Sequence, residues 1–268
     1  MSSFYVIFSS YAFAAPINLA PHRAVYDLSL IKTGNEKKIE YASGRVALEF
    51  SGNACQGFEF ISRQITNITD GEGLNKQVDT RVHNRENAKG TDLKFKSISR
   101  EGSQIVLQSE GRARRDEGGD LSISLHRPQL LKLDMDSKAV FPTAHTRQLI
   151  EAGMRGDSFF NAKTYDGSED GTKIFDTTAI IGKEIPTGTE LRVNHIMKKL
   201  NMKNMRRWPV HVSYFEQGEG ERLPVYKLSY DLFENGISTS LMFNFGNLTL
   251  NGELMHLDLL PEKPCKND

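Results

Sequence analysis

FPTAHTRQLIEAGMRGDSFFNAKTYDGSED, residues 141–170, is the stretch in which the hydrophobic pattern of the chain changes. Pro142 near a helix start and Thr143 as an N-cap, followed by apolar residues at helical spacing, predict a helix over His145–Met154. Gly156 lies just beyond it as a stop signal. A lone helix in a chain otherwise made of strands must bury its short apolar face against the sheet.

Outside this stretch the chain reads as short strands with alternating apolar and polar residues. In His22–Thr33, for example, Ala24, Tyr26 and Leu28 share one face. The other predicted strands are Lys37–Phe50, Gly57–Ile68, Asn75–Asn84, Asp92–Ser99, Gln104–Ala113, Asp120–Leu125, Ser158–Tyr165, Thr172–Ile181, Glu190–Met197, Pro209–Phe215, Pro224–Phe233, Ile237–Phe245 and Leu248–Leu259.

Short turns join these strands, and Asn235-Gly236 is a type I′ hairpin signal. Regularly spaced strands of this kind indicate an antiparallel barrel, sandwich or spiral. We picture a long antiparallel sheet that curls around the helix or is plugged by it. Since each strand has one apolar face, such a sheet would enclose an apolar interior.

The N-terminus resembles a secretory signal peptide over residues 1–15. An apolar run, Phe4–Phe13, leads to the A-x-A site Ala12-Phe13-Ala14, although no Lys or Arg precedes Arg23. The alternative is a buried strand or a disordered leader. The run is shorter than the roughly 20 residues of a membrane-spanning helix. We therefore expect an exported, soluble mature chain without a transmembrane anchor, and, in the absence of a linker, one domain over residues 16–268.

The charge balance excludes one class of partner. The 34 Lys and Arg residues match the 34 Asp and Glu residues, so the net charge is zero. A neutral chain has no overall field to recruit nucleic acid or anionic lipid. We expect no nucleic-acid partner.

The two cysteines, Cys55 and Cys265, suggest a disulfide, because an even count in an exported chain is typical of one. The loop from position 55 to position 265 spans 210 residues. Closing so long a loop stabilises a fold by roughly 5 kcal/mol at most. The alternative is two free buried thiols. A catalytic thiol is disfavoured, because neither cysteine lies in a C-x-x-C motif or beside a His.

No motif in the chain points to catalysis, a cofactor or a metal. The histidines form no H-x-x-x-H or H-E-x-x-H arrangement, and His22 and His145 read as satisfied structural groups. The acidic loop Asp166–Asp170 either binds a hard cation or is a solvated turn, and it lacks the full EF-hand spacing. G-x-S-x-G, Walker A and dinucleotide motifs are absent from the sequence. We predict no catalytic, cofactor-binding or metal-binding residues.

A basic stretch follows later in the chain. It contains Lys198, Lys199, Lys203, Arg206 and Arg207, interleaved with apolar residues. Such a stretch either rests on anionic lipid headgroups or forms a solvated long hairpin.

Several segments match one known family in combination. They are Leu19–Ala24 with Tyr26 and Leu28, Cys55 with Gly57, the FPT-x-H of Phe141–His145, Tyr165–Glu169, Ile181-Gly182, Trp208 with Tyr214-Phe215, and Pro261–Cys265. Together they resemble the EipB family, the periplasmic envelope-integrity proteins of alphaproteobacteria. The leader without a basic n-region and the long basic stretch depart from the family pattern.

The resemblance implies a mainly β fold, a single antiparallel β-spiral or broken barrel curled around one central α-helix. It also implies a disulfide between Cys55 and Cys265, a periplasmic location, a role in envelope integrity, similarity in fold to lipoprotein carriers, and no known catalytic residues.

Two functional hypotheses remain. The first is a non-enzymatic periplasmic protein whose cupped apolar face binds an envelope lipid, another amphipathic ligand or a periplasmic protein partner. The second is an envelope hydrolase with an unrecognised site. Neither hypothesis calls for a cofactor.

Overall fold

The computed structural model describes residues 17–33, 39–135, 138–190, 195–196, 200–218, 220–262 and 264–265. The predicted signal peptide, residues 1–15, lies outside the described residues. The strands are β1 (His22–Thr33), β2 (Ile39–Asn53), β3 (Gly57–Asp70), β4 (Asn75–Glu86), β5 (Asp92–Glu101), β6 (Gln104–Arg115), β7 (Leu121–Arg127), β8 (Leu131–Met135), β9 (Phe159–Thr164), β10 (Phe175–Ile181), β11 (Arg207–Glu216), β12 (Tyr226–Phe233), β13 (Ser238–Asn244) and β14 (Leu248–Leu259). The helices are α1 (Pro142–Arg155) and the short 3-10 turn η1 (Met202–Asn204).

All fourteen described strands belong to one antiparallel sheet. Its order is β8-β7-β6-β5-β4-β3-β2-β1-β14-β13-β12-β11-β10-β9. Strand β1 pairs with β2 on one side and with β14 on the other, so the two ends of the chain meet in the middle of the sheet. The predicted strands β1 and β14 have the bounds expected from the sequence, and most others end close to theirs.

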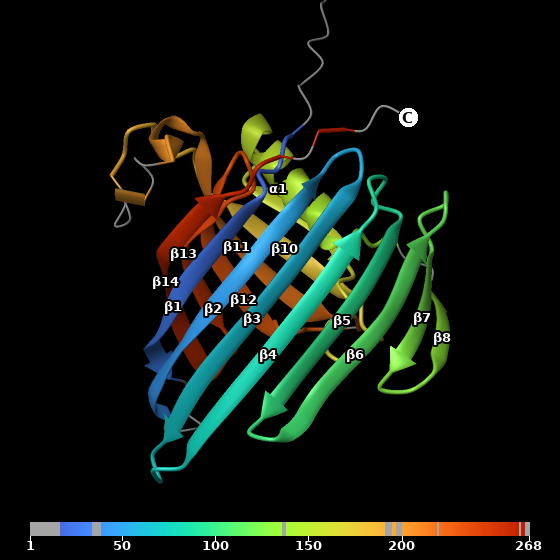
Figure 1. Cartoon of the computed structure of the whole chain (residues 1–268), viewed down its shortest axis with the longest axis vertical. Helices are drawn as coiled ribbons and strands as arrows, with labels where there is room; N and C mark the ends of the chain where they lie inside the picture. The colour runs from blue at the N-terminus through green and yellow to red at the C-terminus, as the bar shows by residue number, and fades with distance from the viewer. Residues whose placement is uncertain are drawn as a thin grey trace, which may run out of the picture.

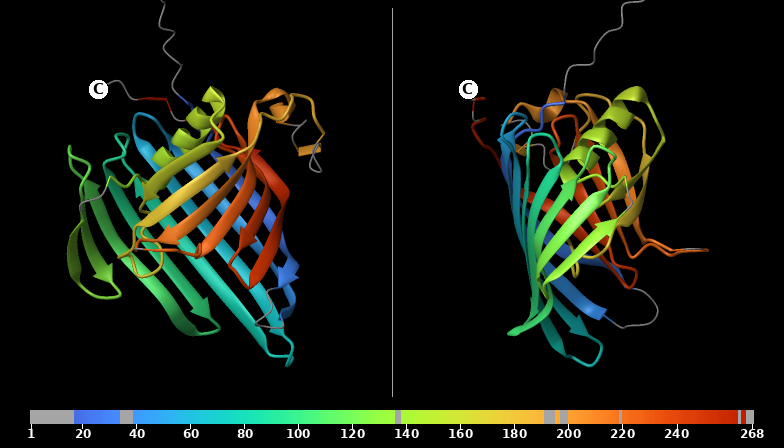
Figure 2. Two further views of the ribbon diagram at one scale, coloured as in Figure 1. Left: turned by 180° about the vertical axis from the view of Figure 1, so that it is seen from behind. Right: turned by 90° about the vertical axis from the view of Figure 1, so that its right-hand side faces the viewer.

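The sheet curls until its two halves face each other, but it does not close (Figure 1). Strands β8 and β9 remain as its two edges. Figure 2 shows α1 at one end of the curled sheet, between the two halves. The predicted fold, an antiparallel broken barrel curled around one α-helix, is confirmed.

The start of α1 differs from the prediction. The N-cap is Phe141, which makes no side-chain capping bond, and the helix begins at Pro142. Thr143 lies inside the first turn, where its backbone N–H (2.9 Å) and its hydroxyl (2.8 Å) both donate to the Glu86 carboxylate. A free N–H of the first turn is therefore satisfied by the end of β4 and not by a local cap. At the other end, Gly156 closes the helix with a φ of 81°.

Helix α1 is held by its apolar face. Leu149, Ile150 and Ala152 are each at most 1% exposed and pack in one cluster with Trp208 of β11. Gly153 lies directly against the indole, because a Cβ at this position would come within 2.8 Å of Trp208 Cδ2. The helix and β11 can approach this closely only because the residue has no side chain.

Two local predictions are wrong. The sequence predicts a strand over Glu190–Met197, but His195 and Ile196, the described residues in its second half, are helical, and Ile196 is buried against the β1–β14 core. At the β12–β13 hairpin, Gly236 has a φ of 84°, whereas Asn235 is not among the described residues with positive φ. A type I′ turn needs positive φ at both positions. The Phe233 carbonyl instead accepts from the Gly236 N–H at 2.9 Å, in a wider turn.

Candidate functional site

An aromatic wall lines the inner face of the sheet on β10 to β12. It consists of Phe175, Tyr214, Tyr226 and Tyr230. The rings of Tyr214 and Tyr226 stack with centroids 4.1 Å apart, and Phe175 packs edge-on against both, at 6.4 and 6.1 Å. Tyr230 packs between the β1–β14 core and the α1 core. Burial raises the pKa of all three tyrosines, so their phenols stay neutral hydrogen-bonding groups.

A polar wall lines the inner face of the opposite half, on β3 to β5. It consists of Ser62, Gln64, Thr66, Thr80, Ser97 and Ser99, which share a face with the buried Phe58 and Leu93 by strand register. The Thr80 and Ser99 hydroxyls bond each other at 2.9 Å, and Gln64 donates to Thr66 at 3.1 Å. Val78 and Val82 lie on the same face among these polar residues, so the interior here is mixed and the expectation of a wholly apolar interior is wrong for this part of the sheet.

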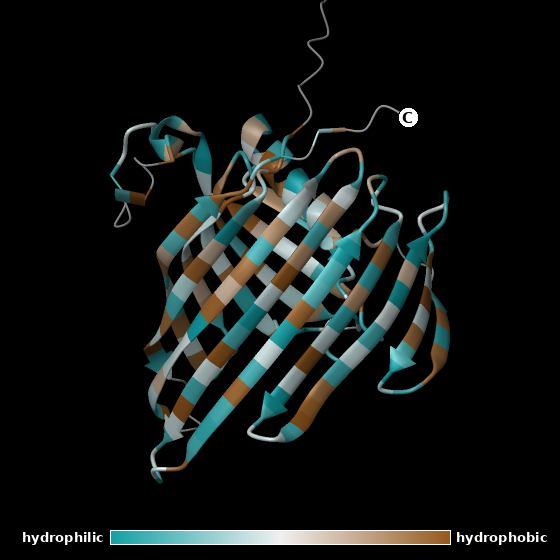
Figure 3. Ribbon diagram, in the orientation of Figure 1, coloured by the Kyte–Doolittle hydropathy of each residue, from teal (hydrophilic) through white to brown (hydrophobic). Residues whose placement is uncertain are grey.

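The reason lies in the alternation of β3 to β5. In β3, Ile61 and Ile65 occupy odd positions and point outward, whereas the even positions point inward and carry Ser62, Gln64 and Thr66 between the apolar residues Phe60 and Ile68. Figure 3 shows this banding of hydrophobic and hydrophilic residues along the strands. The interior is therefore amphipathic, with one aromatic wall and one hydroxyl-rich wall.

The loop between β9 and β10, residues 165–174, joins the two walls. On the polar side, Asn84 donates to the Asp166 carbonyl at 3.1 Å, and the Ser109 hydroxyl donates to the Gly167 carbonyl. On the aromatic side, the carboxylate charge of Asp166 contributes to the raised pKa of both Tyr214 and Tyr226. The loop therefore lies inside the curled sheet.

The acidic residues of this loop are occupied by local partners. Asp170 accepts from the Thr172 N–H (2.9 Å) and hydroxyl (2.6 Å), and Glu169 pairs with Lys173 at 2.7 Å. Within the described residues, no group of three or more His, Cys, Asp or Glu side chains lies close enough to hold a metal ion. This segment is therefore a loop that packs on the core and whose acidic side chains are hydrogen-bonded or ion-paired.

A small pocket of about 240 Å³ lies beside the first turn of α1. Its buried carboxylate is Glu86, which is 5% exposed and bonded to Thr143. Burial raises the pKa of Glu86, and the bonds from Thr143 and the charges of Arg147 and Arg115 oppose that shift. The Arg147 guanidinium lies over the Phe58 ring at 5.0 Å. This arrangement ties α1 to β3 and β4.

The two histidines expected to be structural are buried. His22 is 6% exposed and bonds the Ala20 carbonyl through Nδ1 at 2.8 Å. His145 is also 6% exposed, and its Nε2 lies 3.3 Å from the Thr177 hydroxyl. Burial lowers the pKa of both imidazoles, that of His145 to about 4, so both are neutral at pH 7.

One Ser–His contact escaped the sequence analysis. His211 Nδ1 lies 2.8 Å from the Ser229 hydroxyl, across β11 and β12. The contact is exposed. Cross-strand neighbours separated by 18 positions give no sequence signal, so only strand register could have found the pair. A nucleophile also needs donors placed to stabilise an oxyanion, and this pair sits on an open sheet face, so we read it as a cross-strand contact.

The basic stretch is folded back onto the protein in its described part. Arg206 pairs with Glu184 at 2.7 Å and lies over the Trp208 ring at 5.1 Å. Arg207 is 1% exposed, donates to the Thr189 carbonyl at 3.1 Å and lies over the Phe233 ring. Neither of the readings from sequence, a lipid-facing patch or a solvated hairpin, describes these two arginines. Lys198 and Lys199 lie outside the described residues.

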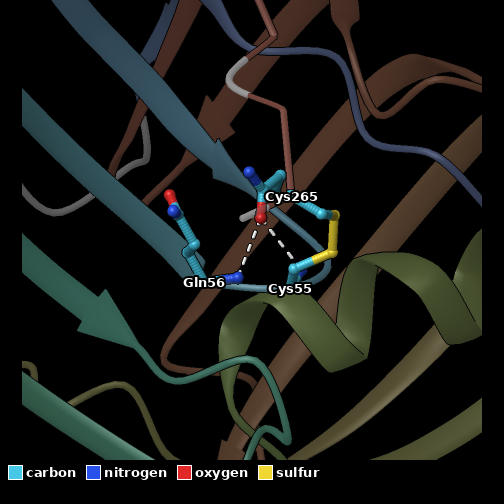
Figure 4. Close-up of a disulfide and its surroundings, with 4 residues drawn as sticks. Cys55, Gln56 and Cys265 are labelled. Atoms are coloured by element: carbon cyan, nitrogen blue, oxygen red, sulfur yellow. Dashed lines mark hydrogen bonds between the residues drawn. A yellow bond between two sulfur atoms is a disulfide. The ribbon is translucent and has the colours of Figure 1, made fainter. Parts of the chain in front are cut away.

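Cys55 and Cys265 form a disulfide, with Cα atoms 5.7 Å apart (Figure 4). Cys55 lies in the β2–β3 turn, where the Asn53 Oδ1 accepts from the N–H groups of Cys55 (2.9 Å) and Gln56 (2.8 Å). Both cysteines are exposed. The bond ties the end of the chain to this turn, close to α1.

We expect Cys55→Ser to lower the melting temperature without abolishing the fold. The bond contributes at most roughly 5 kcal/mol, whereas a chain of this length builds a core of its own. Thermal unfolding followed by circular dichroism measures the shift. Cys265→Ser and the double variant should show the same shift, because all three lack one and the same bond. Alkylation of the denatured, unreduced wild type should label neither cysteine, and two labelled thiols would contradict the bond.

Sequence and structure comparisons agree with one another. A family model described as EipB-like matches residues 13–261. The cell envelope integrity protein EipB of Brucella abortus (strain 2308) is 29% identical over 247 residues, which cover 92% of this chain and 86% of the relative. Among solved structures, a beta-barrel-like protein of domain of unknown function DUF1849 from Brucella abortus matches with a TM-score of 0.84 and 29% identity, over 91% of this chain and all of that one. Among the described helices, none has the length and hydrophobicity needed to cross a membrane.

Proposed function

Because the chain belongs to the EipB-like family, we propose that it helps to maintain the cell envelope, that it works in the periplasm after cleavage of residues 1–15, and that it acts by binding and not by catalysis. The relative named for cell envelope integrity supports the first part. The residues that line the interior support the last part.

The ligand that fits the interior is amphipathic. The aromatic wall offers large apolar surfaces with phenol groups at their edges, which suits acyl chains or other apolar groups. The polar wall offers hydroxyl and amide groups that can bond a headgroup. A lipid-like molecule can contact both walls at once, whereas a purely apolar ligand would make no use of the remaining hydrogen-bonding capacity of the hydroxyl and amide groups on β3 to β5.

The single observation that carries the proposal is the pairing of these two walls across one curled sheet. Tyr214, Tyr226 and Tyr230 are only half-buried although they point inward, so part of each ring is accessible. Accessible aromatic rings opposite hydroxyl groups are typical of a ligand-binding surface.

Titration with a fluorescent fatty-acyl probe, before and after lipid extraction, tests this proposal. We expect saturable binding that increases after extraction. Tyr226→Ala should weaken binding about tenfold, which corresponds to about 1.4 kcal/mol. Lys227→Ala is the matched control, because the neighbouring residue on β12 points to the opposite, outer face.

Two outcomes would contradict this proposal. A probe that fails to bind in both states, while the protein remains folded, would reject a lipid-like ligand. Equal affinity of the Tyr226→Ala and Lys227→Ala variants would place the probe away from the aromatic wall.

A further inference from the structure

The outer face of β1 to β6 carries a trough that neither the fold nor the proposed interior ligand explains. Its volume is about 850 Å³. We call it the outer trough. Its floor is apolar, formed by Ala47, Ile61, Ile98 and Ile105 from four different strands. Ile61 is 44% and Ile105 51% exposed, although neither caps a core.

The rim of the outer trough is basic. Among its lining residues are the cations Arg23, Arg63, Arg81, Lys96 and Arg100, against the single carboxylate Glu49. Asp79, Glu110 and Glu59 contact the rim from outside it, so the rim keeps a small excess of positive charge. Such a surface attracts an acidic partner.

Four of the five cations have an acidic partner, beginning with Arg23, which pairs with Glu49 at 2.7 Å. Arg63 and Arg81 share Asp79, at 2.9 and 3.1 Å, and Lys96 pairs with Glu110 at 2.8 Å. Arg100 makes no ion pair within the part of the chain that the structure describes. One carboxylate between two arginines leaves further donors of each guanidinium for a second acidic group.

The backbone of the trough is closed to strand addition. Strands β2 to β5 each pair on both sides, so their N–H and C=O groups are already bonded. A partner must therefore be recognised by side chains alone, which excludes binding as an additional strand of the sheet.

The exposed fraction of the floor isoleucines indicates which kind of partner fits the outer trough. Ligand pockets enclose 70–90% or more of a small ligand, and an acyl chain on isoleucines that are half exposed would keep one side in water. An amphipathic helix instead buries only its apolar stripe and keeps its other face solvated. Six neighbouring strands at about 4.8 Å spacing span about 24 Å, which is the length of a helix of about 16 residues at 1.5 Å each.

We infer that the outer trough docks an acidic amphipathic helix of a protein partner, with apolar residues on the isoleucine floor and carboxylates on the basic rim. This surface lies on the opposite face of the sheet from the polar wall, so the two sites can be occupied independently.

The test uses the full chain and a synthetic probe. The probe is a fluorescein-labelled 16-residue peptide with a leucine stripe and glutamates on the remaining positions, and its control is a scramble of equal composition without the stripe. Fluorescence anisotropy should show binding at least tenfold tighter for the probe than for the scramble, and weaker binding as salt is added.

Variants locate the binding surface. Arg100→Glu and Ile61→Asp should each weaken probe binding tenfold or more at an unchanged melting temperature. Lys163→Glu on β9 reverses a charge on an exposed residue outside the trough and should have little effect. Tyr226→Ala should leave peptide binding intact, which separates this surface from the interior site.

Three results would overturn the inference. They are equal affinity for probe and scramble, probe binding that ignores Arg100→Glu and Ile61→Asp, and binding to phosphatidylglycerol vesicles without binding to the peptide. The last result would assign the trough to a lipid surface.

Discussion

Replacing Leu149 with aspartate is expected to unfold the protein. Leu149 is 1% exposed and packs with Ile150 and Trp208 where α1 meets the sheet. The substitution removes the contacts of a buried leucine, at a cost of about 2–5 kcal/mol, and adds a buried carboxylate without a partner. The total is comparable with the whole stability of a typical domain, about 5–15 kcal/mol.

The measurement is thermal and urea unfolding by circular dichroism, together with soluble yield. Met154→Asp is the matched control, because Met154 lies on the same helix but is 37% exposed. We expect the control to behave nearly as wild type. A Leu149→Asp variant with unchanged stability would show that α1 contributes nothing to the core.

The second large effect is expected at Gly167, within the loop that joins the two inner walls. Gly167 has a φ of 72°, and a Cβ there would lie 2.2 Å from Phe95 Cγ. Gly167→Ala therefore combines backbone strain of about 1–2 kcal/mol with overpacking against a buried ring, about 1–3 kcal/mol more. We expect a clear fall in the urea midpoint.

Gly73→Ala separates the two contributions. Gly73 has a nearly equal φ of 78°, but nothing lies within 4 Å of its added Cβ. This variant should lose only the strain contribution. Equal destabilisation of the two variants would mean that the loop moves away from Phe95 freely.

The strands could be predicted from the sequence because period-2 alternation is a local signal. The helix could be predicted as well, since Leu149 and Ile150 break that alternation. The N-cap could not, because the group that satisfies Thr143 is Glu86, which is 57 positions away and reaches it only through the curl of the sheet.

The same limit applies to the candidate sites. The basic run 198–207 looked like a surface, yet Arg207 is buried against Phe233, a contact that strand pairing creates. Conversely, the alternation of β3 does indicate the outer trough. Ile61 and Ile65 occupy odd positions and Phe58 and Phe60 even ones, so the two pairs lie on opposite faces of the strand. The curvature of the whole sheet decides which of the two faces turns inward, and this cannot be predicted from the sequence of one strand.

The meeting of β1 with β14 has a consequence for how the chain is made. Strand β1 cannot complete its pairing until β14 has been synthesised. Until then one edge of β1 has N–H and C=O groups without a strand partner. The disulfide partner of Cys55 arrives equally late, 210 residues further on. We therefore expect an incompletely synthesised chain to be more prone to intermolecular strand pairing than the folded protein, because this edge is covered only once β14 is in place.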